Sequence, residues 1–575
     1  MGRLNHALLC SLFALSTACS GTESDSSTNP GEAALPPPFD TVIVGMIYTG
    51  SETAPVAEWV TIKDGYVHEV GTETFDLDTI ERGADFNGDL IILDGGKVAY
   101  PGFTDAHAHL IGIGQRELTL NLEGVASIAE LKERIAAEAE GKAEGEVIFG
   151  RGWIETGWPE GRFPNRDDLD EAAPDNPVVL VRADGHATVA NSAALDAGGI
   201  TDETPDPDGG RIERDANGRA TGMLIDTADR PVRALIDEPS DAERREALKK
   251  GAEVYASWGW TGLHNMSVDI RDAQIIGELE EAGEMPIRVY NAINPGDMDA
   301  LIESGIWELN DGKVTTRAVK FYVDGALGSR GAALHEPYTD QPETSGLLLM
   351  TPEEAMAGYR KAYDNSIQVT THAIGDRGNT LVLDWYEDIL PADRLTYADG
   401  PRWRVEHAQI VDPADIPRFA ALGIIASMQP SHAIGDLHFA PARLGDERLT
   451  GAYAWRSLSD SGAIIAGGSD APVERGDPMI EFYATVARRD LEGYRGDNWH
   501  PDEALSRAEA LDLFTINPAF ASFNEVRLGT LEAGKKADIT VLDGDIMTMP
   551  SGDLPGVKAV MTIVDGEIVY EASAE

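Results

Sequence analysis

Cysteine is almost absent from this sequence of 575 residues, since Cys10 and Cys19 are the only two. Both stand within the first 20 residues, so the rest of the chain contains no pair that could form a disulfide. The same scarcity excludes a structural zinc site built from thiolates in the body of the chain. Any metal bound there would need imidazole and carboxylate ligands instead.

Positive charge is also scarce, with 46 Lys and Arg against 99 Asp and Glu and a formal net charge of −53. Such a surface repels nucleic acid and anionic lipid headgroups, and it favours solubility. The acidic residues are spread along the chain and are not gathered in a tail. This distribution favours a strongly solvated surface over an acidic binding patch. We therefore expect no nucleic-acid partner.

Long apolar runs are lacking after the N-terminus, so no later segment is expected to span a membrane. The N-terminus has one early Arg, an apolar stretch over 7–15 and small residues before Cys19. This pattern predicts a signal peptide over 1–18. Its STAC ending resembles a bacterial lipoprotein signal in which Cys19 is lipidated, although Ser16 stands where Leu is usual. Residues 19–37 predict a disordered tether. We expect an exported, periplasmic protein whose only membrane contact would be this lipid anchor.

The chain is too long for one ordinary hydrophobic core, so we expect a large domain and a smaller one. Hydrophobic residues make up 42% of the sequence, a normal globular fraction. Residues 38–98 and 525–575 share short alternating runs broken by Gly and Asp, which are typical of antiparallel strands. We expect these two ends of the chain to meet in a small β-sandwich.

The intervening range, 99–524, alternates apolar strand-like runs with amphipathic helical segments. About eight such runs are present, the number that a β/α barrel needs. The predicted fold class is therefore α/β, a (β/α)8 TIM-like barrel with a small β-sandwich built from both chain ends. The strand-like runs lie within 98–110, 261–268, 285–293, 317–325, 366–376, 401–410, 423–432 and 462–473.

The segment PGFTDAHAHL, at 101–110, carries three ionisable side chains in an otherwise apolar run. Successive side chains of a strand point to opposite faces, so Asp105, His107 and His109 share one face. Two imidazoles on one face suit a metal ion, but they could equally be two hydrogen-bonded histidines. The remaining ligands of a metal site would have to come from other strands.

Polar residues also end the later runs, where a β/α barrel places its catalytic groups. Lys320 stands between two apolar residues, and burial would lower its pKa unless a carboxylate pairs with it. His372 and His407 each end a run, and Asp470 follows two glycines. Each residue alone has a structural explanation, such as a packed rim or a helix cap. Chance would rarely place such residues at the ends of several successive runs. Together they predict a catalytic metal centre with a position open for water.

The order His-X-His, Lys, His, His and Asp on successive strands resembles the amidohydrolase superfamily of metal-dependent hydrolases. PGFTDAHAHL resembles the first-strand signature of that superfamily, and EAGKKADITVLDGD resembles the segment that closes the sandwich of many members. The motifs VKFYVDGALGSRGAAL, THAIGD, RVEHAQ and GSDAPV are similar to the YtcJ-like or amidohydrolase-3 branch. That branch includes N-substituted formamide deformylase and AepA-type proteins. The resemblance runs from about residue 38 to residue 573.

The resemblance implies a centre of two divalent metals held by His107, His109, His372, His407, Lys320 and Asp470. The first two histidines would bind the more buried ion and the other two the more exposed ion. Lys320 would bridge both ions as a carbamate (N6-carboxylysine), which explains a lysine that faces inward. Asp470 would complete the shell of the first ion. Zinc suits these ligands, although iron, manganese or cobalt also fit. Without the carbamate, a single metal on His107, His109 and Asp470 is the alternative.

The implied reaction is hydrolysis of an amide-type C–N bond in a small molecule of the N-acyl or N-formyl amine class. Two cations would lower the pKa of a bridging water, so that hydroxide is available near neutral pH. Asp470 would act as general base and return the proton to the departing amine. The alternatives are an esterase, lactonase or cyclic-amide hydrolase on the same centre, and a non-catalytic regulatory or binding protein. Relatives are often dimers, which suggests a homodimer.

Candidate substrate contacts lie in motifs near the metal ligands, and each has a structural alternative. His186 is interpreted as a substrate or oxyanion contact or as a loop cap, and Trp153 as a pocket residue or a packed core residue. Arg330 could bind a substrate carboxylate. His432 ends a further strand and faces the same rim, whereas His264 is expected to be structural. The candidates are Trp153, Arg182, His186, Tyr322, Asp324, Arg330 and His432.

Overall fold

The computed structural model describes residues 39–75, 88–155, 157–183, 185, 187–207, 210–236, 239–391, 397, 400–496 and 499–573. The predicted signal peptide, the predicted tether and Cys19 therefore lie outside the described residues, as does His186. In the described part of the chain, no helix combines the length and the apolar character needed to cross a bilayer.

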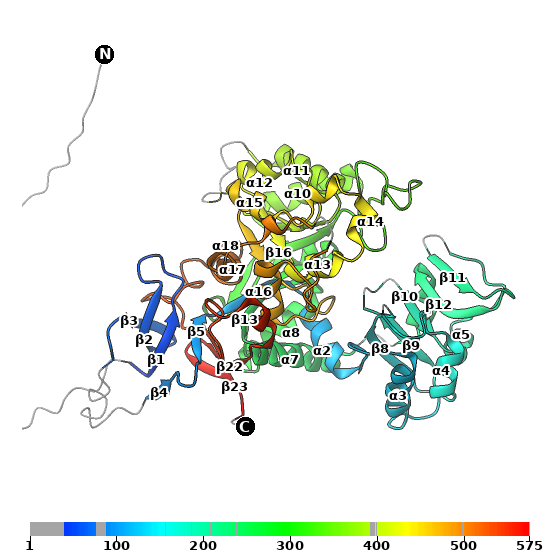
Figure 1. Cartoon of the computed structure of the whole chain (residues 1–575), viewed down its shortest axis with the longest axis horizontal. Helices are drawn as coiled ribbons and strands as arrows, with labels where there is room; N and C mark the ends of the chain where they lie inside the picture. Colours follow the sequence, from blue (N-terminus) through cyan, green and yellow to red (C-terminus); the bar gives the residue numbers. More distant parts are fainter. Residues whose placement is uncertain are drawn as a thin grey trace, which may run out of the picture. The chain divides into compact units, whose positions relative to one another are not determined.

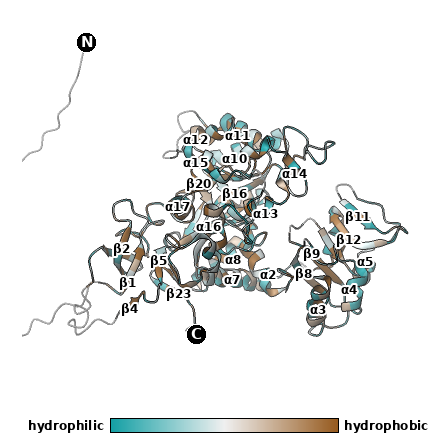
Figure 2. Cartoon of the chain, viewed as in Figure 1, coloured by the Kyte–Doolittle hydropathy of each residue, from teal (hydrophilic) through white to brown (hydrophobic). Residues whose placement is uncertain are grey.

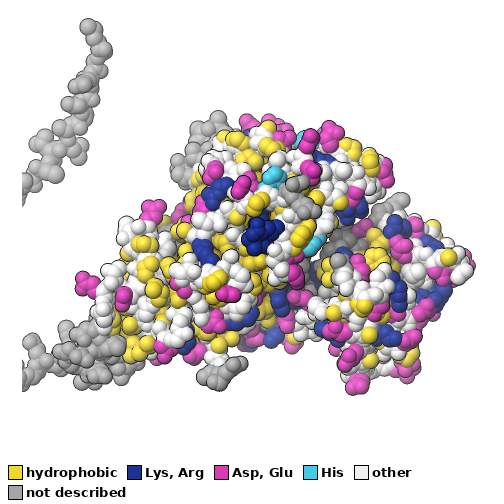
Figure 3. Space-filling model, in the orientation of Figure 1, with side chains coloured by type: hydrophobic (Ala, Val, Ile, Leu, Met, Phe, Trp, Pro, Cys, Tyr) yellow, Lys and Arg dark blue, Asp and Glu magenta, His cyan; other side chains and the backbone are white. Residues whose placement is uncertain are grey.

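The acidic composition is visible on the surface. Figure 3 shows Asp and Glu side chains scattered over the visible face, among fewer Lys and Arg side chains. The acidic side chains in this view do not collect into one patch. This distribution agrees with the spread of Asp and Glu along the sequence and keeps like charges apart on the surface.

Within the described residues, eight parallel strands form one sheet, called the barrel sheet, in the order β20-β19-β18-β17-β16-β14-β13-β6. Figure 1 labels its strands β13 and β16 among the helices. Each strand pairs with the next strand of the barrel in the sequence, as in a β/α barrel. Each of the eight lies in or overlaps one of the strand-like runs identified above, with β13 and β16 beginning before their runs, so the predicted barrel is confirmed. The bounds are β6 (Phe103–Ala108), β13 (Trp260–Val268), β14 (Arg288–Ile293), β16 (Val314–Tyr322), β17 (Gln368–Ala373), β18 (Arg404–His407), β19 (Ile425–Met428) and β20 (Ile465–Gly467), with a short strand β15 (Trp307–Leu309) antiparallel to β16.

The barrel is nearly closed where its first strand, β6, meets its last, β20. The buried carboxylate of Asp105 accepts hydrogen bonds from the backbone N–H and the hydroxyl of Ser469, at 3.0 and 2.6 Å. The N–H of Asp470 donates to the carbonyl of His107 at 2.7 Å. A Cβ on Gly468 would lie 2.5 Å from the amide nitrogen of His107, so this close approach requires glycine.

Helices cover the outside of the barrel sheet. Three of them begin with capping boxes, in which Ser240, Thr351 and Ser506 each exchange hydrogen bonds with a Glu three residues later. Their buried faces join the strands in one large hydrophobic cluster. The helices are α2 (Leu110–Leu118), α7 (Asp241–Trp258), α8 (Ile270–Glu281), α9 (Met298–Ser304), α10 (Pro352–Asp364), α11 (Asp376–Ile389), α12 (Ile416–Leu422), α13 (Pro430–Asp436), α14 (Ala440–Leu444), α15 (Trp455–Asp460), α16 (Pro478–Ala487), α17 (Arg507–Phe514) and α18 (Ile516–Ala521). A separate short helix, α6 (Arg230–Arg233), buries Val232 in another hydrophobic cluster.

Strands from both ends of the described chain form one further sheet, called the terminal sheet, in the order β23-β22-β21-β5-β1-β2-β3, with β4 paired to β1. Buried apolar side chains from both ends, including Ile43, Val60 and Ile539, share one hydrophobic cluster. The two ends therefore share one hydrophobic core. The bounds are β1 (Thr41–Tyr48), β2 (Val56–Lys63), β3 (Tyr66–Gly71), β4 (Asp89–Ile92), β5 (Val98–Pro101), β21 (Ile539–Leu542), β22 (Ala559–Val564) and β23 (Glu567–Glu571).

The range predicted for the barrel also contains a separate sheet over 120–226, called the insert sheet, which the sequence analysis did not anticipate. Its order is β11-β12-β10-β9-β8-β7. It has hydrophobic clusters of its own, and the apolar residues of its strands are visible in Figure 2. Its elements are β7 (Leu120–Asn121), α3 (Ile128–Ala139), β8 (Ile148–Trp153), α4 (Arg166–Ala172), β9 (Val178–Arg182), β10 (Ala187–Ala190), α5 (Ser192–Ala197), β11 (Gly210–Arg214) and β12 (Ala220–Asp226).

Candidate metal centre

The predicted ligands stand at or near the C-terminal ends of barrel strands, where the fold places functional groups. His107 and His109 come from the end of β6 and the residue after it, and Lys320 comes from β16. The register pairs Tyr322 of β16 with His372 of β17. The neighbouring pair is Ala373 of β17 with His407 of β18. The turn after β20 supplies Asp470.

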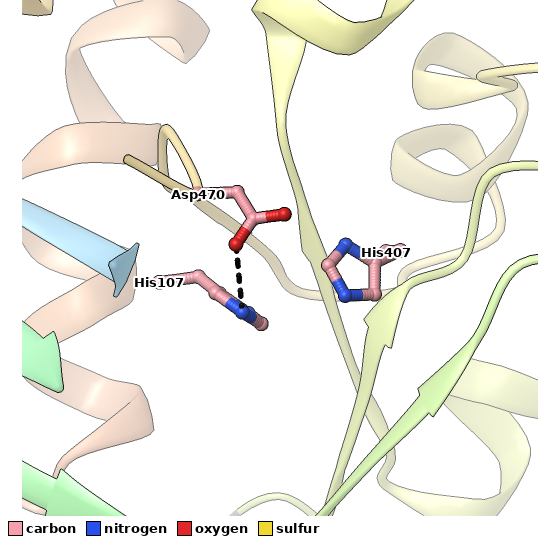
Figure 4. Close-up of side chains that lie close together, drawn as sticks. All are labelled: His107, His407 and Asp470. Carbon is pink, nitrogen blue, oxygen red and sulfur yellow. Dashed lines mark ion pairs between the residues drawn. The ribbon is translucent and has the colours of Figure 1, made fainter. Parts of the chain in front are cut away.

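Three of these residues form one close group. Ligand atoms of His107, His407 and Asp470 all lie within 4.8 Å of one another, and all three side chains are buried. Figure 4 shows them converging from two strands and a loop, with the Asp470 carboxylate beside the His107 ring. Asp470 Oδ1 lies 3.4 Å from His107 Nε2. Two imidazoles and a carboxylate form a donor set that a divalent metal accepts.

The other predicted ligands adjoin this group. His109 Nε2 lies 3.0 Å from Asp470 Oδ1, and Lys320 Nζ lies 3.3 Å from His107 Nε2. The ring of His372 lies 4.5 Å from that of His407, between centroids. The structure therefore brings all six predicted ligands to one place, although they span more than 360 positions of the sequence.

The outer nitrogen of several histidines is held by an acceptor. His107 Nδ1 lies 2.6 Å from Glu406 Oε2, and His109 Nδ1 lies 2.9 Å from the carbonyl oxygen of Met266. His407 Nδ1 lies 2.8 Å from Gln429 Oε1. An imidazole that donates its Nδ1–H keeps its Nε2 lone pair free, which is how metal-binding histidines are oriented. These three histidines are therefore prepared for a cation.

His372 gives an independent test of this fit. Its Nε2 is buried and makes no hydrogen bond with any of the described residues. The nearest carboxylate oxygen, Asp324 Oδ1, is 3.5 Å away. A buried polar atom left without a partner is unfavourable unless a ligand satisfies it. A divalent metal would do so, and the residues present therefore fit one.

Burial sets the protonation state of the histidines. Loss of solvation, with repulsion from Lys320, lowers the pKa of His107 to about 4 and that of His372 to about 3. Burial likewise holds the pKa of His407 well below its ordinary value. Burial alone would raise the pKa of Asp470, but the adjacent histidines outweigh it and hold this pKa well below its usual range. At neutral pH the group therefore presents neutral imidazoles and a carboxylate, as metal binding requires.

Lys320 faces the interior and is 1% exposed. Among the described residues, no carboxylate forms an ion pair with its Nζ, which lies 5.0 Å from the ring centroid of Tyr322. Burial lowers the pKa of Lys320 to about 8, against the attraction of Glu406 and Asp470. A substantial fraction of this amine is therefore neutral near physiological pH.

Two candidate substrate contacts adjoin the predicted ligands. His432, at the start of α13, has its Nε2 3.6 Å from Asp470 Oδ2 and its Nδ1 2.9 Å from Gln409 Nε2. Tyr322 ends β16, with its ring centroid 5.5 Å from that of His372, and 36% of the residue is exposed. Both residues could therefore reach a molecule bound at the centre.

Asp324 and Arg330 are already engaged in ways that the sequence analysis did not foresee. The buried carboxylate of Asp324 accepts hydrogen bonds from the backbone N–H groups of Ala333, Ile374 and Gly375. It therefore holds loops together and has little capacity left for a substrate. Arg330 forms a two-pronged ion pair with Asp340, so its charge is already neutralised.

Trp153 and Arg182 lie in the insert sheet. Trp153 is fully buried in the core of that sheet, and its Nε1–H donates to the carbonyl of Leu180. Its role is therefore packing, not the lining of a substrate pocket. Arg182 pairs with Glu155 at 2.8 Å. His186 lies outside the described residues.

Glu406, Gln429 and Gln409 contact candidate histidines on the side away from the centre of the site and were not predicted from the sequence. A signal for Glu406 was present, since a glutamate in the apolar run RVEH is as unusual as Lys320 in its own run. Gln409 and Gln429 each follow a strand end by one or two residues. Polar residues at such positions are candidates in any β/α barrel.

Comparisons with known proteins identify the family of the chain. The model of the Amidohydrolase family, Amidohydro_3, matches residues 95–570. A Bacillus subtilis (strain 168) protein named as an amidohydrolase, YtcJ, is 33% identical over 538 residues, covering 92% of this chain and 99% of that protein. N-substituted formamide deformylase of Arthrobacter pascens is 32% identical over 540 residues, covering 90% and 95%. The solved structure of an uncharacterised metal-dependent hydrolase from Pyrococcus horikoshii has a TM-score of 0.72 at 28% identity, covering 89% of this chain and 99% of that one. The chain therefore belongs to the amidohydrolase family.

Proposed function

We propose that this chain is a metal-dependent hydrolase that cleaves an amide-type C–N bond in a small molecule of the N-acyl or N-formyl amine class. The position of Asp470 carries the proposal, because its Oδ1 lies 3.0 Å from His109 Nε2 and 3.4 Å from His107 Nε2. A carboxylate beside imidazoles suits both metal ligation and proton transfer. The similarity to an N-substituted formamide deformylase supports the substrate class.

The proposed centre holds two divalent metals, for which zinc suits the ligands, although iron, manganese or cobalt also fit. His107, His109 and Asp470 would hold one ion, and His372 and His407 the other. When bound, such metals supply Lewis acids that polarise a carbonyl group and lower the pKa of water. A single ion on His107, His109 and Asp470 is the alternative if Lys320 stays unmodified.

Lys320 is proposed to carry a carboxyl group on Nζ. The neutral amine would attack carbon dioxide, so that an N–C bond forms as one C=O π bond of carbon dioxide opens. An amine proton would pass to water, which leaves an anionic carbamate. The burial of Lys320, its pKa lowered by that burial to about 8 and its lack of an ion-pair partner among the described residues support this modification. The added negative charge would face the four histidines, where cations are expected.

Asp470 performs the proton transfers in the proposed reaction. It accepts a proton from the attacking water as the water oxygen bonds to the carbonyl carbon. It then returns this proton to the nitrogen as the C–N bond breaks, so that an acid and an amine leave. Tyr322 and His432 are the proposed substrate contacts. Because Gln409 Nε2 faces His432 Nδ1, His432 would carry its hydrogen on Nε2 and donate it to the substrate carbonyl.

The cellular setting is proposed from the sequence. The apolar stretch over 7–15 supports export to the periplasm, and the STAC sequence supports a lipid anchor on Cys19. The net charge of −53 argues against a nucleic-acid partner. A homodimer is proposed as the assembly.

The test compares the wild type with the D470N variant on N-formyl amines, N-acyl amines, esters and lactones, with products identified by mass spectrometry. The wild type should release an acid and an amine, and D470N should lower kcat at least about 100-fold. The control is D388N, which changes an exposed carboxylate on α11 and should keep full activity. Turnover that survives in D470N would reject the base assignment. If the wild type cleaves only esters or lactones, the proposed substrate class is wrong. If the wild type contains no metal and shows no turnover, the chain is better explained as a binding protein.

A further inference from the structure

Glu406 is a fully buried carboxylate on β18, directly before His407. Its Oε2 lies 2.6 Å from His107 Nδ1, and this contact joins residues 299 positions apart. Glu406 does not face the substrate side of His107, because it contacts the nitrogen opposite to the one beside Asp470. Neither the expected ligand set nor the proposed proton transfers use this residue.

Arg404 holds this carboxylate from inside the barrel. It has the same parity as Glu406 on β18, so both side chains share a face. Its Nε lies 2.7 Å from Glu406 Oε1, and its side chain is also fully buried. The rest of the guanidinium donates to the carbonyl of Ala106, the hydroxyl of Ser427 and Nδ1 of His264. Arg404 is therefore fixed from several strands and leaves Glu406 little freedom to turn away.

Glu406 differs in charge from the acceptors behind the other histidines. His109 has the carbonyl of Met266 behind it, and His407 has the amide oxygen of Gln429, both of which are neutral. A carboxylate that accepts an imidazole N–H draws the proton toward itself. The other nitrogen of that ring then becomes the more basic donor to a metal. His107 should therefore bind more strongly than His109 or His407.

We propose that Glu406, held by Arg404, is a positioning residue. It fixes the His107 ring so that Nδ1–H points to Glu406 and Nε2 points to the metal. It thereby makes the position on His107 the tighter of the two metal positions. The proposal rests on the proposed function to the extent that His107 is a metal ligand. Neutralising Glu406 should weaken metal binding without removing any atom that contacts the metal or the substrate.

The test measures zinc affinity directly. The full-length wild type and E406Q are stripped of metal, and zinc dissociation constants are determined by competition with a chromophoric chelator. E406Q should raise the dissociation constant of the tighter site by about 10–100-fold, the range expected for a partner behind a histidine ligand. The matched control is E280Q. The Glu280 carboxylate is also buried, but it pairs with Lys313 at 3.3 Å and not with a candidate metal-ligand histidine. E280Q should change the constant by less than about twofold, whatever it does to the melting temperature.

The outcomes separate the two proposals. A wild type that binds no zinc would overturn the proposed function, whereas a wild type that binds zinc and an E406Q protein of equal affinity would overturn this inference alone. If E406Q does not fold, E406D keeps the charge beside Arg404 but shortens the reach to His107, and it should also weaken zinc binding. A crystal structure of the zinc-loaded wild type gives the last check. Zinc on His107 Nε2 with Glu406 on Nδ1 supports the inference, and zinc on Nδ1 overturns it.

Discussion

Asp105 and Ser469 are joined by two hydrogen bonds, from the backbone N–H and from the hydroxyl of Ser469, at 3.0 and 2.6 Å. Asp105 stands two residues before His107 and also accepts a hydrogen bond from the backbone N–H of His107, at 3.0 Å. Ser469 directly precedes Asp470. The contact therefore connects the two ends of the barrel sheet and sets the separation of two predicted metal ligands. Closure of the fold and assembly of the site depend on the same pair of residues.

The S469A variant should lower both stability and metal affinity. It removes the hydroxyl that donates to the buried Asp105 and leaves that carboxylate with one donor fewer. The expected loss in the free energy of unfolding is about 1–3 kcal/mol. The measurement is the urea midpoint, with S457A as control, whose hydroxyl donates to the half-buried Glu503. Equal midpoints for the two variants would contradict the role given to Ser469.

The K320M variant should lose metal as well as activity. Methionine keeps much of the length of the side chain but cannot take up carbon dioxide, so one ion loses an anionic ligand. The metal content should fall from about two ions per chain to about one, and turnover at least about 100-fold, because each metal contributes several kcal/mol. Mass spectrometry measures the metal content of each variant. The control is K313M, which changes a lysine that pairs with Glu280 and should keep both ions. Two ions retained in K320M would reject the carbamate bridge.

Removal of metal should destabilise the folded chain. A ligand that binds only the folded state, at 100 times its dissociation constant, stabilises that state by about 2.7 kcal/mol. Treatment with a chelator should therefore lower the melting temperature and abolish turnover, and added zinc should restore both. Calorimetry with zinc and with calcium distinguishes a specific site, because calcium prefers oxygen ligands. A melting temperature that responds equally to both cations would argue against the histidine centre.

Glu481 should make the folded state less stable as pH rises. Burial holds the pKa of this carboxyl on α16 well above its usual value of 4.5, against the hydrogen bond from the N–H of Ser431. Above pH 4.5 the unfolded chain releases this proton while the folded chain retains it, so the free energy of unfolding falls with increasing pH until the raised pKa is passed. E481Q keeps an acceptor for Ser431 but cannot titrate. Urea unfolding from pH 5 to 8 should show a smaller decline for E481Q, and parallel curves would refute the prediction.

The strands of the barrel and the residue types of the site were predictable, because both depend on local patterns. Apolar runs broken by turn residues located all eight barrel strands, from β6 to β20. The same alternation placed His107 and His109 on one face, and polar residues at the ends of later runs pointed to His372, His407 and Asp470. In a β/α barrel, strand ends gather at one mouth, so this part of the site follows once the fold is recognised.

The insert sheet was not predictable in the same way. Its strands β7, β8 and β9 pair in parallel with helices between them, which is the local texture of the barrel itself. Periodicity reports which face of a strand is buried, but not which sheet buries it. Trp153 shows the consequence, since its apolar surroundings in the sequence fitted a pocket and a core equally well, and its burial inside the insert sheet decides for the core.

The sequence by itself determined the eight-strand pattern, the scarcity of thiols and the imidazole, amine and carboxylate groups available to a metal. Only the tertiary structure decided how those groups are held. It placed Glu406 behind His107 across 299 residues and filled the carboxylate of Asp324 with backbone N–H groups. It also paired Arg330 with Asp340. The physical reason is that a side chain's role depends on the partners that neutralise or orient it, and those partners come from distant strands and loops brought together by the closed fold.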